Sequence, residues 1–298
     1  MKKRLVITFF SAIIALSSWA DGKDINGICY ELDTYRATAT VTYFPGSSLY
    51  SGSVIIPETI YYDGDEFTVT RIGTRAFEHC AWLESVTIPK SVTRIGDYAF
   101  QYCSRLTTVN IPNSVTSIGA YAFLECSSLM NINIPASITS ISYDAFRQCT
   151  SLKSLVVDAG NTVFDSRNNC NAIIDTQSNT LIVGCQNTLI PNSVTYIADY
   201  AFSGCSGLTI ITIPNSVTNI GTSAFSGCTG LSSVSIGNSV TSIGVRTFEN
   251  CTSLTSVSIG NSVTSIGERA FSGCSGLTSV TIPNSVTNIE IFAFSDCI

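Results

Sequence analysis

The sequence repeats one short pattern, Ala/Thr-Phe-x-x-Cys, nine times over its 298 residues. The cysteines form two series in which neighbours stand 23 residues apart: Cys80, Cys103, Cys126 and Cys149, then Cys205, Cys228, Cys251, Cys274 and Cys297. A period between about 20 and 50 residues is typical of chains that stack one structural unit on the next. The sequence therefore predicts an extended solenoid with a repeated surface, whose plan includes no dedicated catalytic pocket.

Each repeat contains two short stretches that alternate apolar and polar residues, which favours two short β-strands per unit. After Cys251 these stretches are 257–259 and 263–266, each followed by a turn residue, Gly260 and Gly267. Pro takes the place of the first of these glycines in most repeats, and both residues end strands. We expect the Ala-Phe pair to form a single helical turn that brings the cysteine inward. The predicted fold is a repeat solenoid of mostly short β-strands with single helical turns.

The regions outside the regular repeats have their own β-patterns. Residues 21–50 contain two β-runs, 27–32 and 37–43, which predict a β-hairpin cap on the first rung. The first block of repeats covers 51–157 and includes a short hairpin turn at 62–67. The insertion at 158–187 contains two apolar runs around the turn 176–179, which we interpret as a β-hairpin projecting from one continuous solenoid.

The second block of repeats covers 188–298 and stops one residue after Cys297, at a repeat boundary and with the C-terminal cap absent. An uncapped stack exposes apolar side chains and unpaired strand edges. We therefore expect the natural chain to continue beyond Ile298, or this end to be covered by a partner.

Residues 1–20 have the pattern of a cleaved signal peptide, with Lys2, Lys3 and Arg4 before a short apolar run and small residues leading to Ala20. Removing this segment would leave 12 basic against 21 acidic residues, a net charge of −9. An acidic protein with few cations is a poor match for nucleic acid. No other stretch is apolar enough for a membrane span. The sequence predicts a secreted or cell-surface protein.

The consensus Cys-x-x-Leu-x-x-Val-x-Ile-Pro-x-Ser-Val-Thr-x-Ile-Gly-x-x-Ala-Phe-x-x resembles the Treponema-type leucine-rich repeat of BspA-like bacterial surface proteins. The resemblance extends from about Val54 to Cys297. It implies a leucine-rich-repeat solenoid that is secreted or displayed on the surface. Some members are described as adhesins for host extracellular-matrix proteins or for other bacteria. The family offers no residue-level binding motif that could be carried over to this chain.

The twelve cysteines do not have the spacing of a metal site, because no Cys-x-x-Cys occurs. We expect the repeated cysteines to be buried free thiols that pack as small apolar residues, with disulfides as the open alternative. Cys170 and Cys185 flank the insertion hairpin and are the best candidates for a disulfide, which secretion would permit. His79 is the single histidine, so a nucleophile–histidine arrangement is not expected. The sequence predicts no catalysis, no cofactor and no metal.

Two groups of residues are candidates for binding. The first is the outward position between Val and Ile of the first β-stretch, a face of small uncharged side chains: Thr87, Asn110, Asn133, Thr212, Ser235, Ser258 and Thr281. This face lacks the aromatic and Arg side chains that dominate most interfaces. The second group consists of aromatic side chains concentrated in the first block, as candidate anchors for a partner: Tyr61, Tyr62, Trp82, Tyr98, Tyr102, Tyr121 and Tyr143.

We therefore expect protein–protein interaction or adhesion, with host extracellular-matrix proteins or other bacterial surface proteins as partners. The alternative is a purely structural component of an extracellular matrix or surface layer. A carbohydrate-directed function is disfavoured in the sequence, since no pair of carboxylates with nearby aromatic residues stands out.

Overall fold

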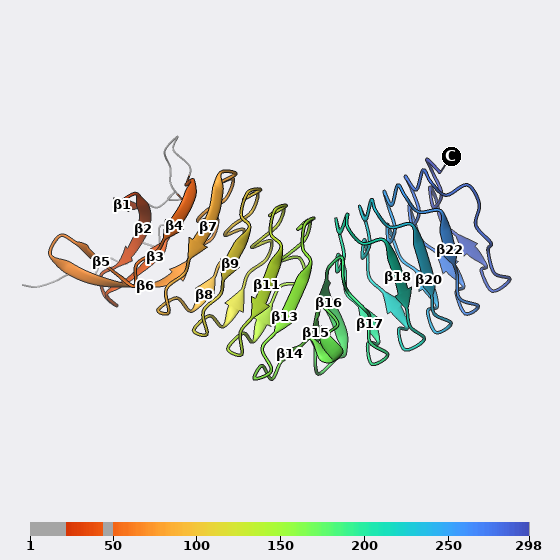
Figure 1. Cartoon of the computed structure of the whole chain (residues 1–298), viewed down its shortest axis with the longest axis horizontal. Helices are drawn as coiled ribbons and strands as arrows, with labels where there is room; N and C mark the ends of the chain where they lie inside the picture. Colours follow the sequence, from red (N-terminus) through yellow and green to blue (C-terminus); the bar gives the residue numbers. More distant parts are fainter. Residues whose placement is uncertain (1–21, 44–49, 298) are drawn as a thin grey trace, which may run out of the picture.

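The computed structural model describes residues 22–43 and 50–297, and the expected signal peptide lies outside these residues. They form a gently curved β-solenoid of about ten turns with almost no helix (Figure 1). The predicted repeat solenoid is confirmed. Each turn contributes short strands that pair with the equivalent strands of the next turn, so that most hydrogen bonds between strands connect residues one repeat apart.

The first predicted β-stretch of each repeat forms a parallel ladder. In the first block its strands are β4 (Gly52–Ile55), β7 (Leu83–Thr87), β9 (Thr108–Asn110), β11 (Asn131–Ile134) and β13 (Ser154–Val157). In the second block they are β18 (Ile210–Ile213), β20 (Ser233–Ile236) and β22 (Ser256–Ser258). Alternate side chains point into the core, so the others form one continuous exposed face in each block.

The second β-stretch forms a ladder whose strands, apart from the first, are two residues long. It starts at β6 (Asp65–Ile72) and continues through β8 (Arg94–Ile95), β10 (Ser117–Ile118) and β12 (Ser140–Ile141). The second block repeats it in β17 (Tyr196–Ile197), β19 (Asn219–Ile220), β21 (Ser242–Ile243), β23 (Ser265–Ile266) and β24 (Asn288–Ile289). Along this ladder Thr hydroxyls donate to the carbonyl one repeat earlier, as Thr116 Oγ1 does to the oxygen of Thr93 at 3.2 Å.

The Ala-Phe segment does not form the helical turn that the sequence suggested. The N–H of Phe77 donates to the carbonyl of Ala99 in the next repeat (2.7 Å), whereas the N–H of Cys80 donates to the carbonyl of Phe77 (3.1 Å). His79 adopts a left-handed conformation with φ of 61°. Because alternate N–H groups bond to the neighbouring repeat, the segment is a series of tight turns. The one helix among the described residues is the 3₁₀ turn η1 (Arg167–Asn169).

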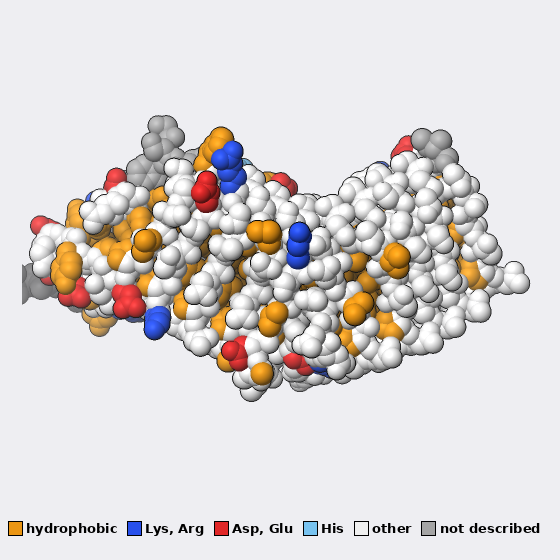
Figure 2. All heavy atoms as spheres, viewed as in Figure 1, with side chains coloured by type: hydrophobic (Ala, Val, Ile, Leu, Met, Phe, Trp, Pro, Cys, Tyr) orange, Lys and Arg blue, Asp and Glu red, His pale blue; other side chains and the backbone are white. Residues whose placement is uncertain are grey.

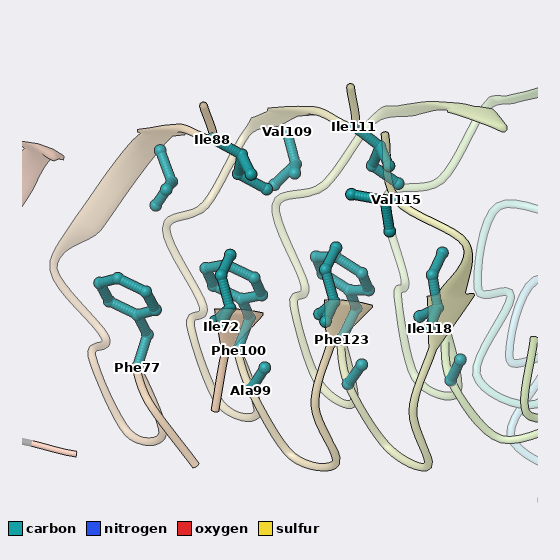
Figure 3. Packing of buried hydrophobic residues seen from close by; sticks show 14 of the residues in the cluster. Ile72, Phe77, Ile88, Ala99, Phe100, Val109, Ile111, Val115, Ile118 and Phe123 are labelled. Atoms are coloured by element: carbon teal, nitrogen blue, oxygen red, sulfur yellow. The ribbon is translucent and has the colours of Figure 1, made fainter. Parts of the chain in front are cut away.

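The core is a row of stacked phenylalanines surrounded by Leu, Ile and Val. Figure 3 shows the rings of Phe77, Phe100 and Phe123 side by side, each at the same place in its repeat. Their centroids are 5.1 and 5.2 Å apart, and the rings are nearly parallel. One repeat cannot bury both faces of its Phe, which explains why the unit is stable only in a stack.

The N-terminal region has three antiparallel strands where the sequence predicted two. β1 (Lys23–Ile25) precedes the expected pair, β2 (Ile28–Asp33) and β3 (Thr38–Val41), and β3 then pairs in parallel with β6. β5 (Thr59–Tyr62) and β6 form the expected hairpin around the turn after Tyr62. The N-terminal strands therefore continue the second ladder and cover the first rung.

The insertion contains the expected hairpin but does not project. It comprises β14 (Phe164–Asp165), β15 (Ala172–Asp175) and β16 (Thr180–Gly184), with β15 and β16 antiparallel. β16 pairs in parallel with β17, and all of its residues are buried. Ile182 packs in the core of the first block, while Leu181 packs in that of the second. The hairpin is buried on both faces, because it supplies the rung between the blocks.

Candidate interaction surfaces

The structure places the predicted polar positions on the exposed face of the first ladder. Thr87 stands next to Asn110, and Thr212, Ser235 and Ser258 follow one another in register. Thr281 is exposed but lies outside the strands. Figure 2 shows one face of the molecule, made mainly of backbone and of side chains that are neither charged nor hydrophobic, with hydrophobic side chains between them. We call the exposed side of the first ladder, in both blocks, the strand face.

Sequence reasoning missed the apolar residues of the strand face. Met130, Val156 and Ile210 are exposed on or beside its strands. Leu189, which is 76% exposed, lies after the insertion at the position that corresponds to Thr212 one repeat later. Aligning the repeats would have found them, since they replace the usual Thr, Ser or Asn. These four lie around the junction of the two blocks. Ile55 of β4, 72% exposed and in register with Thr87, adds an apolar side chain at the other end, so the strand face is less uniform than its composition suggests.

The seven candidate aromatic anchors do not form one site. Tyr61 and Tyr62 lie on the β5–β6 hairpin, where the hydroxyl of Tyr61 donates to Glu66 (3.0 Å). Tyr98 and Tyr121 stack on each other in the tight turns, with the Arg75 guanidinium also over the Tyr98 ring, and Tyr102 stacks on His79, so each ring has at least one face covered. Tyr143 stands exposed on a later turn.

Trp82 has the best geometry for an anchor. Its side chain is 59% exposed at the start of β7, beside the strand face. The guanidinium of Arg105, from the next repeat, lies 3.8 Å from the ring centroid. Within the described residues no carboxylate is within ion-pair distance of Arg105. Trp and Arg are the side chains that most often dominate binding energy, and here they are already held together.

The repeated cysteines are buried thiols, apart from the half-buried Cys297, and most of them donate to a carbonyl of the preceding repeat. The thiol of Cys103 donates to the carbonyl of Phe77, and that of Cys228 donates to the carbonyl of Phe202, each at 3.1 Å. Burial raises the pKa of Cys80 to about 11 and that of Cys149 to about 12. A raised pKa keeps Cys80 and Cys149 in the thiol form, which is not the nucleophile. Cys274 differs, because its side-chain hydrogen bond with Cys251 lowers its pKa.

The structure contains no disulfide between Cys170 and Cys185, the pair that the sequence offered as the best candidate. Both are free thiols, as are the other cysteines in the described residues. Cys185 packs in the core of the first block and donates to the carbonyl of Asn171 (3.3 Å), while Cys170 packs in the core of the second. The two side chains are separated because the hairpin directs them to opposite faces.

A search of the described residues finds no cluster of three or more His, Cys, Asp or Glu side chains suited to a metal ion. In the same part of the chain, no helix has the length and apolar character needed to cross a membrane.

Parallel two-strand repeats around an inward row of Leu and Phe define a leucine-rich-repeat solenoid. The sequence model of the BspA type leucine rich repeat region, with six copies, matches residues 65–174 and 181–298. The chain belongs to this family, as the resemblance in the sequence indicated.

Solved structures agree with this assignment. A leucine rich cell surface protein from Faecalibacterium prausnitzii is 26% identical, with a TM-score of 0.57 and coverage of 95% of this chain and 94% of that one. The pneumococcal vaccine antigen PcpA shares the fold at 21% identity, with a TM-score of 0.59 and coverage of 92% and 86%. No protein with a curated description matches the chain.

Proposed function

We propose that the chain is exported by its N-terminal leader and acts at the bacterial surface or outside the cell as a protein-binding adhesin. The observation that carries the proposal is the strand face, whose exposed polar residues lie in register within each block, are interrupted by apolar side chains and have Trp82 beside them. The cell-surface relative from Faecalibacterium prausnitzii supports the location.

Binding is concentrated in the first block and at the junction. Trp82 with Arg105 supplies an aromatic and a cationic contact, and Met130 and Val156 supply apolar ones. The strands of the second block carry Ser and Thr in the same places, which gives weaker contacts. The large number of similar rungs adds avidity when the partner is itself repetitive.

The test is binding of the purified chain, without residues 1–20, to a panel of host extracellular-matrix proteins and to surface proteins of other bacteria. The proposal expects saturable binding to at least one of them, weakened about tenfold or more by Trp82→Ala. Tyr143→Ala, which removes an exposed aromatic outside the strand face, is the control. Absence of binding to every protein in both panels would overturn the proposal.

A structural role in an extracellular layer is the second candidate. Leu189 and Ile210 are exposed apolar side chains that would suit association between copies. This role predicts assembly that increases with protein concentration in sedimentation experiments, together with no binding in the panels.

A further inference from the structure

Two arginines lie on neighbouring strands of the second ladder, and neither forms an ion pair within the described part of the chain. Arg71 in β6 is in register with Arg94 in β8, and both side chains are exposed. Among the described residues no carboxylate is within ion-pair distance of either guanidinium. Like charges on directly neighbouring strands destabilise a sheet. The pair therefore works against folding, in a chain with few cations.

The fold does not require charge at this position. Arg94 is the first residue of a two-residue strand, and the equivalent residues are uncharged in the other strands of this ladder: Ser117, Ser140, Tyr196, Asn219, Ser242, Ser265 and Asn288. A small polar side chain is sufficient there. The ladder has charge only where it approaches the N-terminal strands β2 and β3 (Figure 1).

The arginines border a hollow that is rich in hydroxyl and carboxylate groups. A space of about 770 Å³ is lined by Glu31, Asp33, Tyr35, Thr70 and Arg71. A second space of about 500 Å³ shares Glu31 and Arg71 with the first and extends to Arg94. Tyr35 is 93% exposed on the β2–β3 turn, and Asp33 is held by an ion pair with Arg36 at 2.9 Å. The hollow thus combines cations, hydroxyls, acidic acceptors and an aromatic ring.

We propose that this hollow binds a glycan that carries carboxylate groups, such as a uronate-containing chain. Arginine binds a carboxylate through two parallel hydrogen bonds, which suits the Arg71–Arg94 pair. Glu31 and the Thr side chains accept and donate hydrogen bonds to sugar hydroxyls. Tyr35 offers a ring face against which a sugar can pack. An acidic peptide fits less well, because its carboxylates would meet the arginines but it has no sugar hydroxyls for Glu31 and the Thr side chains. The site is separate from the strand face and does not depend on its protein contacts.

The test is calorimetric titration of the chain with tetragalacturonate, compared with the same tetramer fully methyl-esterified. The proposal expects saturable binding of the acid, weakened by added salt, and no binding of the ester. The double variant Arg71→Gln/Arg94→Gln should bind about tenfold or more weakly. Lys153→Gln removes one exposed cation elsewhere and should bind as the unmodified chain does.

The melting temperature of the double Gln variant checks its folding. Because the substitution removes a like-charge pair, the melting temperature should be unchanged or raised. The variant Arg71→Lys/Arg94→Lys keeps the charge but loses the planar fork, so intermediate affinity is expected. The proposal is overturned if tetragalacturonate does not bind, or if the double Gln variant binds it equally well. Equal or tighter binding of hexaglutamate, or of a sulfated oligosaccharide that has no carboxylates, would also overturn it.

Discussion

The thiol of Cys126 donates a hydrogen bond to the backbone carbonyl of Phe100, one repeat earlier, with 3.1 Å between sulfur and oxygen. The same carbonyl accepts the N–H of Cys103 at 3.2 Å. The same bond to the Phe carbonyl of the preceding repeat is made by Cys103, Cys149, Cys228, Cys251, Cys274 and Cys297. The 23-residue cysteine spacing reflects a hydrogen-bond ladder inside the core as well as the packing of a small apolar residue.

This ladder predicts that Cys126→Ala destabilises the protein more than Cys126→Ser does. Alanine removes the donor and leaves the Phe100 carbonyl with one partner fewer, at a cost of about 1–3 kcal/mol in the free energy of unfolding. Serine keeps a donor in nearly the same place. Urea denaturation measures the difference. A core that needs only an apolar side chain would give the reverse order.

Cys80 is the matched control, since its thiol is 3.8 Å from the carbonyl of Glu78 in its own turn and makes no bond to an earlier repeat. We expect Cys80→Ala and Cys80→Ser to differ less than the two Cys126 variants.

Stability should fall as the pH rises above 9. Burial raises the pKa of Cys80 to about 11, and those of Cys149 and Cys228 to about 12, from an ordinary 9.0. Above pH 9 the unfolded chain therefore loses these protons before the folded chain does. Each thiol then lowers the free energy of unfolding by about 1.4 kcal/mol per pH unit, until its folded pKa is reached. Urea midpoints that stay constant between pH 8 and pH 11 would contradict this account.

Gly184 should not tolerate a side chain. A Cβ at this position would overlap the ring of Phe202, because β16 lies where the previous Phe would otherwise stack. We expect Gly184→Ala to lower the free energy of unfolding by about 1–3 kcal/mol. Gly244→Ala is the control, since its new Cβ would meet nothing nearer than the carbonyl of Ile220 at 3.3 Å. Equal melting temperatures for the two variants would argue against the buried position of β16.

Asn161 connects the start of the insertion to the first block through side-chain hydrogen bonds. Its Nδ2 donates to the carbonyls of Pro135 and Ile138, both at 2.9 Å, and its Oδ1 accepts the N–H groups of Val163 and Phe164. Asn161→Asp would place a carboxylate against two carbonyls in a buried site. We expect a loss of at least about 2 kcal/mol in the free energy of unfolding, read from thermal or urea melting. The loss should exceed that of Asn169→Asp, an exposed position on η1.

The repeat period predicts the solenoid, its two ladders and the inward Phe row, because each depends on local alternation that recurs every 23 residues. The tight turns after Gly73 could not be inferred in the same way. Ala-Phe is compatible with a helix, and only the neighbouring repeat decides where the N–H of Phe77 donates. Sequence reasoning within one unit does not include that neighbour.

The insertion carried a signal that the projecting interpretation missed. A hairpin that projects into solvent would alternate polar and apolar residues, whereas the run from Leu181 to Val183 is continuously apolar. Such runs are typical of strands buried on both faces. The opposite orientations of Cys170 and Cys185 follow from the same fact.

The candidate surfaces could be predicted only in part. Spacing alone gives the outward column from Thr87 to Ser258, and the structure confirms that these side chains are exposed. The stacking of Arg105 on Trp82 and the pairing of Arg71 with Arg94 join residues from neighbouring repeats or from the N-terminal strands. Their contacts become visible only when the repeats are placed in register.

The most direct test of the account compares one substitution at equivalent places in the two blocks. Asn133→Arg and Ser235→Arg each put a long cation on the strand face, on β11 and on β20. Binding to a partner identified in the surface-protein panels should weaken about tenfold or more for Asn133→Arg and stay nearly unchanged for Ser235→Arg. Equal affinities, or a loss confined to Ser235→Arg, would contradict the assignment of binding to the first block.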